Sequence, residues 1–489
     1  MAPRTHRARR AFSALASLAG TTLLASVAAA QPAAAPPTAA PTAAPAAAPS
    51  TPTPAPADAT RPASPDLLRA TPGALTSAEV ARRAAETSYS AKASEEAIRG
   101  AAARVDAAWA NYLPRLTGTA RYTRLSSFTP PSFAGFSFPL VLDNYLLQAS
   151  VVVPISDYFL RINQGYTAAT HAATAARYDL VAAKAKAASD GKVAYYGWLT
   201  ARAGSVVAEA TLELQKTLVV DAKSQFAVGN ASRSDVLQAE SAVAAAELTV
   251  ERSKNLVRLT ERQVRVAMHA ADEQAIAPGE DFESELPAFQ GNLADLVREA
   301  HAGRYEVKSI DANADAATAQ AHAALGGRYP SLAAFADGQY SNPNQRRFPQ
   351  TDEWFGTWDV GVQLTWSPND LLTAGAGGDE ANARAAQIVA QKGVVRDGIE
   401  LEVTQAWQSV KEAEFAVATT KRQLDSATEG YRVARELFTH GRATATQVRE
   451  AETAFTRARL DNLNAKAQGR TARVRLEHAL GRDASDFAR

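Results

Sequence analysis

Small side chains recur at every seventh residue along two segments of the chain, 232–269 and 444–481, here called the return limbs. In the first return limb the valines are Val236, Val243, Val250, Val257 and Val264, and the small residues three positions further on are Ala239, Ala246, Ser253, Thr260 and Ala267. The second return limb has Ala451, Ala458, Ala465, Ala472 and Ala479 at the matching positions. Heptad spacing predicts helices packed along a seam, and small side chains let a partner helix approach closely. We therefore expect a helical sheet or tube.

Each return limb follows a helical segment about twice as long. Residues 158–228 and 370–440 would each extend about 105 Å at the rise of an α-helix. Two further helical segments, 77–113 and 291–329, are about as long as the return limbs and would complete each layer by stacking end to end with them. The pattern predicts two long antiparallel helical hairpins.

The junctions between elements are repeated in the two halves of the chain. A Thr-Ser-Ala-Glu capping box at 76–79 begins the first helix, which the proline of Asn-Tyr-Leu-Pro-Arg-Leu at 111–116 ends. The sequence Gly-Arg-Tyr-Pro-Ser-Leu at 327–332 matches this junction, and Pro154 matches Pro368. A pattern repeated at a nearly fixed offset indicates a duplicated structural unit.

Four segments near these junctions alternate between apolar and polar or small residues. They are 116–125, 145–153, 331–341 and 358–366; in the second, one face carries Tyr145, Leu147, Ala149, Val151 and Val153. Alternation over about ten residues is typical of strands in a membrane β-barrel with the apolar face outward. An ordinary half-buried hairpin is the alternative for any single strand.

Four strands cannot close a barrel, and an open edge in lipid would leave backbone N–H and C=O groups unpaired. Subunits must then share the barrel. Two chains would supply eight strands, which side chains fill, whereas three chains supply twelve and leave room for passage. The predicted fold is mainly α with a membrane β part: long antiparallel helical hairpins form an α-barrel, and four strands per chain contribute to a trimeric 12-stranded β-barrel.

A short stretch occurs twice, as Phe-Ala-Val-Gly-Asn-Ala-Ser-Arg-Ser-Asp-Val at 226–236 and Phe-Thr-His-Gly-Arg-Ala-Thr-Ala-Thr-Gln-Val at 438–448. The matching positions are Phe226 and Phe438, Gly229 and Gly441, Ser232 and Thr444, and Asp235 and Gln447. Glycine suits the left-handed residue after a helix. A hydroxyl three residues later, followed by an acid or amide, suits the capping box of the next helix. Each copy is predicted to be the tip of a helical hairpin.

The first 30 residues have a basic start, an apolar run and Ala-Ala-Ala before Gln31, as in a cleaved secretory signal; a retained membrane anchor is the alternative. Removing the four arginines of this segment lowers the formal net charge from +1 to −3. The predicted organisation is a signal peptide at 1–30, an Ala/Pro-rich disordered linker at 31–75, a first repeat at 76–269, an irregular linker at 270–290, a second repeat at 291–482 and a tail at 483–489.

Composition argues against several kinds of chemistry. The chain has no cysteine, which excludes disulfides, thiolate metal sites and a lipid-bearing cysteine. Its seven histidines lack metal-ligand spacing, and the mature charge gives no basic surface for nucleic acid. We predict no enzyme activity, cofactor or metal. The glycines of 375–378 are interpreted as a flexible strand-to-helix junction rather than a nucleotide loop.

Taken together, these features resemble the TolC-like outer-membrane efflux proteins, or outer membrane factors. The resemblance covers about 75–482 and rests on the two tips, the Leu-Pro and Tyr-Pro junctions, the two strand pairs and Leu480-Gly481 at the end of the last helix. It implies a homotrimer in outer-membrane lipid, with its helices in the periplasm. It further implies a periplasmic adaptor (membrane fusion) protein and an inner-membrane transporter as partners.

The implied function is passive passage of small molecules or polypeptides to the outside, in tripartite efflux or type I secretion. A periplasmic coiled-coil scaffold without channel activity is the alternative, although it would not explain the strands. The predicted tip and gate residues are Phe226, Gly229, Ser232, Asp235, Phe438, Gly441, Thr444, Gln447 and Glu450.

The chain departs from the family at the second tip. The resembling proteins often have Tyr at the position of Phe438 and acids at those of Gln447 and Glu450. Since Phe438 has no hydroxyl to donate to Asp235, the closed state must be held differently, with Arg442 and Arg449 as candidates. Asp235 is either a gate residue or a plain capping residue. Glu450 either forms a carboxylate ring at the entrance or is a solvated helix residue.

Overall fold

The computed structural model describes residues 73–127, 141–229, 231–270, 276–282, 284, 286–348 and 350–487. All of these residues belong to one compact unit of the chain. The predicted signal peptide, nearly all of the predicted linker and residues 128–140 of the loop between the first two strands lie outside the described residues.

The four predicted strands are confirmed and form one antiparallel sheet in the order β1-β2-β3-β4. The strands are β1 (Arg115–Arg124), β2 (Asp143–Val153), β3 (Ser331–Asn342) and β4 (Phe355–Thr365). Residues opposite each other on neighbouring strands share a face. Val151 lies opposite both Leu116 and Ala336, which in turn lies opposite Val360, so the register gathers the apolar residues on one face of the sheet.

Two long helical hairpins are likewise confirmed. The helices are α4 (Asn163–Ala227), α5 (Arg233–Ala267), α8 (Pro368–Thr439) and α9 (Ala445–Ala479). The chain enters α4 through a short helix, α3 (Ile155–Asp157), and a π-helical turn at Tyr158–Ile162. Pro368 begins α8, where its fixed φ and missing N–H cost nothing. The small-residue stripe of α9 is its packed face, because Ala458, Ala465, Ala472 and Ala479 are all buried.

The two half-length helices are each broken once, which corrects the prediction of continuous helices at 77–113 and 291–329. The pieces are α1 (Ser77–Thr87), α2 (Tyr89–Ala110), α6 (Leu293–Gly303) and α7 (Tyr305–Leu325), the last followed by a 3-10 turn at Gly326–Arg328. Ser88 and Arg304 have extended backbone at the breaks, with ψ of 134° and 129°. Both breaks therefore occur at equivalent positions of the two halves.

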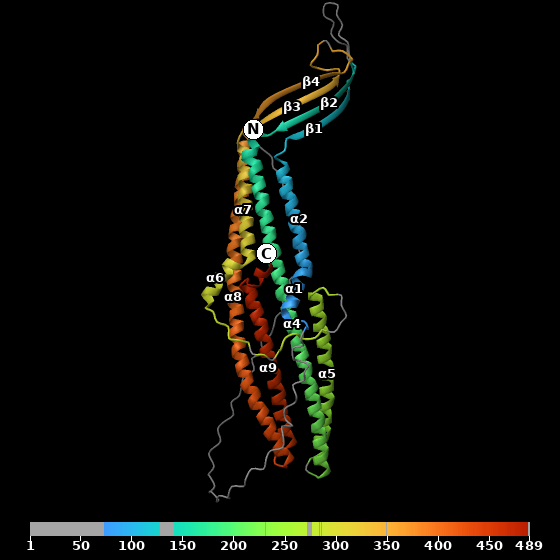
Figure 1. The fold of residues 1–489 in the computed structure, drawn as a ribbon, viewed down its shortest axis with the longest axis vertical. Helices are drawn as coiled ribbons and strands as arrows, with labels where there is room; N and C mark the ends of the chain where they lie inside the picture. Colours follow the sequence, from blue (N-terminus) through green and yellow to red (C-terminus); the bar gives the residue numbers. More distant parts are fainter. Residues whose placement is uncertain are drawn as a thin grey trace, which may run out of the picture. The chain divides into compact units, whose positions relative to one another are not determined.

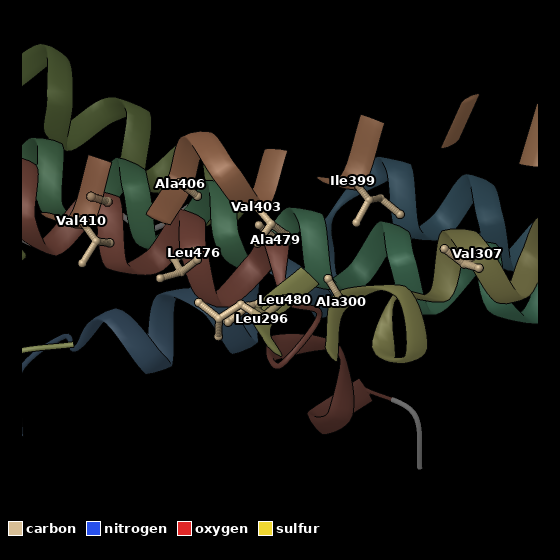
Figure 2. Close-up of a cluster of buried hydrophobic side chains, with 11 residues drawn as sticks. Leu296, Ala300, Val307, Ile399, Val403, Ala406, Val410, Leu476, Ala479 and Leu480 are labelled. Atoms are coloured by element: carbon tan, nitrogen blue, oxygen red, sulfur yellow. The ribbon is translucent and has the colours of Figure 1, made fainter. Parts of the chain in front are cut away.

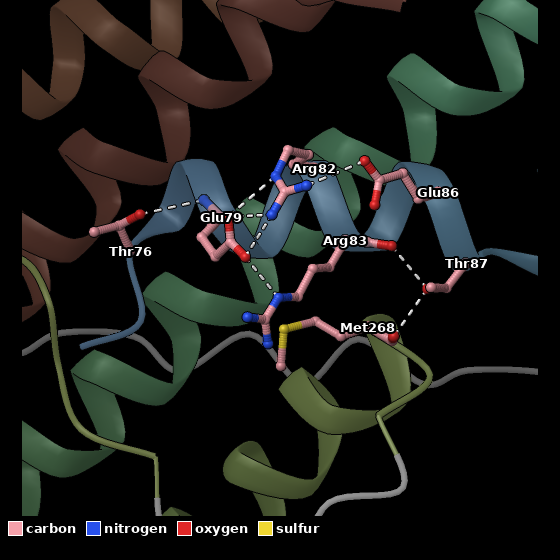
Figure 3. A network of polar contacts seen from close by, with 7 residues as sticks. All are labelled: Thr76, Glu79, Arg82, Arg83, Glu86, Thr87 and Met268. Atoms are coloured by element: carbon pink, nitrogen blue, oxygen red, sulfur yellow. Dashed lines mark hydrogen bonds and ion pairs between the residues drawn. The ribbon is translucent and has the colours of Figure 1, made fainter. Parts of the chain in front are cut away.

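At each break, the half-length helix contacts the C-terminal end of the return limb from the same half of the chain. The Thr87 hydroxyl donates to the carbonyl of Met268 at 2.8 Å, as Figure 3 shows. In the second half, Arg304 Nη1 donates to the carbonyl of Ala479 at 3.3 Å and pairs with Glu402 at 3.0 Å. These contacts satisfy carbonyls that a helix C-terminus leaves without partners. A contact far away in sequence accounts for a break that local periodicity does not predict.

The capping box predicted at 76–79 is only half formed. The Thr76 hydroxyl accepts from the Glu79 N–H at 3.2 Å, as expected. The Glu79 carboxylate, however, pairs with Arg82 and Arg83 at 2.8 and 2.7 Å instead of returning to the Thr76 backbone (Figure 3). The two arginines one turn further along the helix are stronger partners for the carboxylate than a backbone N–H.

At each level of the helical part, four helices lie side by side (Figure 1). Next to the sheet, successive contacts give the order α2-α4-α7-α8, and beyond the breaks they give α5-α4-α9-α8. The predicted stacking is therefore confirmed, with α2 continuing α5 and α7 continuing α9. Where the levels meet, a core packs α6, α7, α8 and α9 around Val403 and Leu476, both fully buried (Figure 2).

The glycines of 375–378 lie within α8, which corrects their interpretation as a flexible junction. Gly378 is packed so closely against Leu325 that a Cβ would lie 2.3 Å from its Cδ2, so the glycine serves helix packing. The described residues of 270–290 contain neither helix nor strand, as expected, apart from one bridge of Pro278 to Leu75. The predicted tail includes a 3-10 helix at Asp483–Phe487.

Candidate functional site

The first tip has the predicted turn. Gly229 follows α4 with a φ of 80°, in the left-handed region that glycine adopts without strain. The Ser232 hydroxyl accepts from the Asp235 N–H at 3.2 Å, and the Asp235 carboxylate accepts from the Ser232 N–H at 2.9 Å. The capping box is confirmed, and its hydrogen bond from the Ser232 N–H is the main cause that lowers the pKa of Asp235.

The second tip repeats this geometry with an amide in place of the acid. Gly441 has a φ of 70° and donates to the Phe438 carbonyl at 2.9 Å, while the Arg442 N–H donates to the Leu437 carbonyl at 2.8 Å. These two bonds are those of a Schellman motif. The Thr444 N–H donates to Gln447 Oε1 at 2.8 Å, which completes the second capping box.

The two phenylalanines of the tips have different surroundings. Phe226 is 47% exposed, whereas Phe438 is 9% exposed and lies in a cluster with Tyr431 and Val448. Leu214 and Leu218 of α4 cover this cluster. The second tip is therefore anchored on the first hairpin.

A polar contact between α5 and α9 helps to join the two hairpins near their tips. Arg449 of α9 donates from Nη1 to Gln238 Oε1 of α5 at 2.5 Å, and its charge also favours ionised Asp235. Asp235, Phe438 and Arg449 line one small cavity. The side chain of Arg442 makes no hydrogen bond or ion pair within the described ranges. Gln447 is turned back to its own cap, and Glu450 is exposed on α9.

The apolar face of the sheet is exposed over all four strands. Leu116 is 73% exposed, Leu147 48%, Trp358 76% and Val362 66%. Large apolar side chains rarely gather on a free protein surface without a partner or lipid to cover them. The opposite face is polar, and there Gln148 donates to Asp337 at 3.3 Å and Arg346 pairs with Asp359 at 2.7 Å.

Aromatic side chains form a row at the loop end of the apolar face. Tyr122 contacts Tyr145 with ring centroids 5.1 Å apart, and Trp354 bridges Tyr145 and Tyr340 at 5.8 and 5.0 Å. At the helix end of β4, Trp366 is 54% exposed. Aromatic rings at both ends of an apolar band are typical of membrane strands. The alternating pattern does not predict the position of Trp354, because this residue lies outside the alternating segments.

In the described part of the chain, the outermost strands and helices each have one side that no other element of the chain covers. The sheet has β1 and β4 as its edges, so each presents one unpaired row of backbone groups. The outer side of α5 exposes Leu237, Leu248 and Leu259, and α8 exposes Val394 and Phe415. These sides are suited to contact with further copies of the chain.

None of the helices in the described ranges has the length and apolar character needed to cross a membrane. Among the described residues, no group of three or more His, Cys, Asp or Glu side chains is placed to hold a metal ion.

An apolar, aromatic-bordered sheet carried on long helical hairpins fits the class of channel-forming outer-membrane proteins. The family model of the outer membrane efflux proteins matches residues 78–268 and 296–482, which is more than half of the chain. The chain therefore belongs to the outer membrane efflux protein family. The comparison with curated proteins gives no match.

Solved structures share the fold at low sequence identity. The outer-membrane channel OprN is 17% identical with a TM-score of 0.70, covering 84% of this chain and 94% of its own. VceC of Vibrio cholerae is 19% identical with a TM-score of 0.67, covering 82% of this chain and 95% of its own. The open state of MtrE from Neisseria gonorrhoeae is 18% identical with a TM-score of 0.67, covering 83% and 88%.

Family and fold confirm the resemblance to outer membrane factors and the predicted fold class. The protein is an efflux channel of the outer membrane, with its helical part in the periplasm. The roles of the individual tip residues and the domain boundaries stay predictions.

Proposed function

We propose that three copies of the chain form the outer-membrane channel of a tripartite efflux or type I secretion system. Small molecules or polypeptides would pass through it without energy input from the channel itself. The observation that supports this most directly is that sheet and helices are both four elements wide, with open sides at every level.

The number of subunits follows from the width of the sheet. Three copies give twelve strands and twelve helices at each level, whereas eight strands would leave an interior that side chains fill. In such a trimer, β1 of one subunit pairs with β4 of the next, and the exposed leucines of α5 face the apolar side chains of α8. These pairings would cover the unpaired strand edges and the exposed apolar side chains of the single chain.

The apolar face of the sheet then contacts lipid and the polar face lines the passage. Asp337 and Asp359 lie directly opposite each other on the polar face, and Arg346 from the loop after β3 pairs with Asp359. Charged groups are costly on the lipid side and tolerated inside a water-filled barrel, which supports this orientation.

The two tips would form the periplasmic end that meets an adaptor protein bound to an inner-membrane transporter. They are the tightest turns at the far ends of α4 and α8 from the sheet (Figure 1). We propose that Phe226, exposed on the first tip, contacts the adaptor. Arg449, rather than Arg442, would help to hold the closed state through Gln238.

The tip glycines provide a test. Gly229→Val and Gly441→Val put a β-branched side chain at positive φ, which costs on the order of 1–2 kcal/mol locally. No heavy atom lies within 4 Å of either added Cβ, so the disturbance is confined to the backbone of the turn. We expect efflux in a strain lacking its own channel to fall, while native mass in mild detergent still shows a trimer.

Gly430→Val is the matched control. Gly430 also has open space around an added Cβ, but it lies inside α8 with ordinary helical φ. Its efflux should stay close to wild type. Normal transport in both tip variants would contradict the docking role, and a stable monomer in mild detergent would contradict the trimer.

A further inference from the structure

A carboxyl group is buried between the two hairpins near their tips. Glu452 lies two turns into α9 and is 3% exposed. Its Oε1 accepts from the Thr456 hydroxyl at 2.9 Å, and Gln215 of α4 adds a side-chain hydrogen bond. Both partners are neutral. Within the described ranges, no lysine, arginine or histidine forms an ion pair with Glu452.

The surrounding groups do not neutralise a charge there. From α8, the buried ring of Tyr431 stacks on Phe455 at 5.7 Å, and among the described residues its hydroxyl has no hydrogen-bond partner. Arg435 of α8 is directed to Asp221 of α4 at 3.9 Å. On α9 itself, Arg449 is directed to Gln238, and Glu450 is exposed.

A buried carboxyl group without a cation is stable when protonated and costly when ionised. Burial is the main cause that raises the pKa of Glu452 above its ordinary value of 4.5. The packed hairpins therefore hold a proton that separated hairpins would release. Packing is strongest below the ordinary pKa and weakens as pH rises from there to the raised value.

We propose that Glu452 is the residue through which protons control the separation of the two hairpins at the periplasmic end. With the carboxyl protonated, α9 packs on α4 and the end stays closed. When the carboxyl loses its proton, water must reach it, and the seam between α4 and α9 opens. This inference rests on the proposed role of the tips as the entrance of the channel.

Single-channel recording of the purified trimer in planar bilayers tests the proposal. In wild type, the ratio of open to closed time should rise above about pH 4.5, by up to tenfold per pH unit for each Glu452 that ionises on opening, until the raised pKa is reached. Glu452→Gln keeps the shape and hydrogen bonding of the side chain and cannot ionise. This variant should stay mostly closed with a flat profile over that range.

Glu247→Gln is the control, because Glu247 is an exposed glutamate on α5. It should keep the wild-type profile. A Glu452→Gln channel whose opening depends on pH as in wild type would overturn the proposal, and so would a wild-type channel with no pH dependence above pH 4.5.

A second measurement separates this inference from the proposed channel function. The chain has no cysteine, so spin labels can be attached at Ser224→Cys on α4 and Arg457→Cys on α9, both exposed. The distance between the labels should increase with pH in the wild-type background and stay constant with Glu452→Gln. If the label distance changes with pH but the protein conducts no ions, the proposed channel function is refuted and the proposed role of Glu452 is supported. If the label distance stays constant with pH in both wild type and Glu452→Gln, the proposed role of Glu452 is refuted.

Discussion

The two tips have the same backbone conformation but differ in the side-chain contacts that fix them in place. Both have a left-handed glycine and a reciprocal capping box, so their turns are nearly the same. The second tip places Phe438 in a buried cluster against α4, whereas Phe226 of the first is half exposed. Turn geometry is local, and anchoring depends on which helix lies next to the tip.

This difference suggests a division of labour. The second tip is fixed to the first hairpin by apolar packing and by the Glu452 seam, so its movement requires that the hairpins separate. The first tip keeps an exposed aromatic ring and an ionised capping residue, Asp235, which would be available to the proposed adaptor protein. Duplicated sequence has thus produced one anchored tip and one presented tip.

The largest expected contrast is between Phe438→Ala and Phe226→Ala. Removing a buried phenylalanine ring typically costs about 3 kcal/mol or more, whereas a half-exposed ring contributes far less. Phe438→Ala should therefore speed hydrogen–deuterium exchange in the peptides of the second tip and in the facing part of α4. Phe226→Ala should leave exchange near the wild-type rate at both tips. Equal protection loss in the two variants would remove the distinction between an anchored and a presented tip.

Sequence reasoning succeeded where the determining interactions are local. The glycines at 229 and 441 and the hydroxyls three residues later determine their turns through hydrogen bonds between residues at most five positions apart, so both capping boxes could be predicted. The strands could be predicted because alternation reports directly on the two faces of a sheet. The heptad stripe of α9 was found for the same reason, since a helix face can be counted along the chain.

What sequence reasoning missed depends on contacts distant in sequence. The breaks at Ser88 and Arg304 come from return limbs that end beside them, more than 170 residues away. The burial of Glu452 depends on Gln215 of the other hairpin, and its heptad position gave no reason to distinguish it from an exposed glutamate. At 76–79 the capping-box pattern predicts that the Glu79 carboxylate binds the Thr76 backbone N–H, but Glu79 pairs with Arg82 and Arg83 instead.

A smaller contrast separates the acid of the first capping box from the amide of the second. The hydrogen bond from the Ser232 N–H lowers the pKa of Asp235 below its ordinary value of 3.8. Its stabilisation is complete above that value and is lost as pH falls from there through the lowered pKa, while Gln447 does not titrate. Exchange at the start of α5, corrected for intrinsic rates, should increase relative to α9 between about pH 6 and about pH 3.

Asp235→Asn is the control for this effect, since asparagine caps a helix without a titrating group. It should make the first tip as insensitive to acid as the second. Acid sensitivity that persists in Asp235→Asn would assign it to another group.

The smallest expected effect concerns charge at the proposed entrance, where the tips differ again. Glu450 is exposed on α9, and threefold symmetry would place three copies around one axis. Gln447 adds no charge and its side chain is held by Thr444, so the ring would carry half the charge of an entrance with two acids per chain. Glu450→Gln should lower cation selectivity and block by multivalent cations in single-channel recordings. Gln447→Asp should raise both, because the aspartate keeps the capping bonds as Asp235 does and adds a charge. Unchanged block in both variants would leave Glu450 as an ordinary solvated residue of the helix.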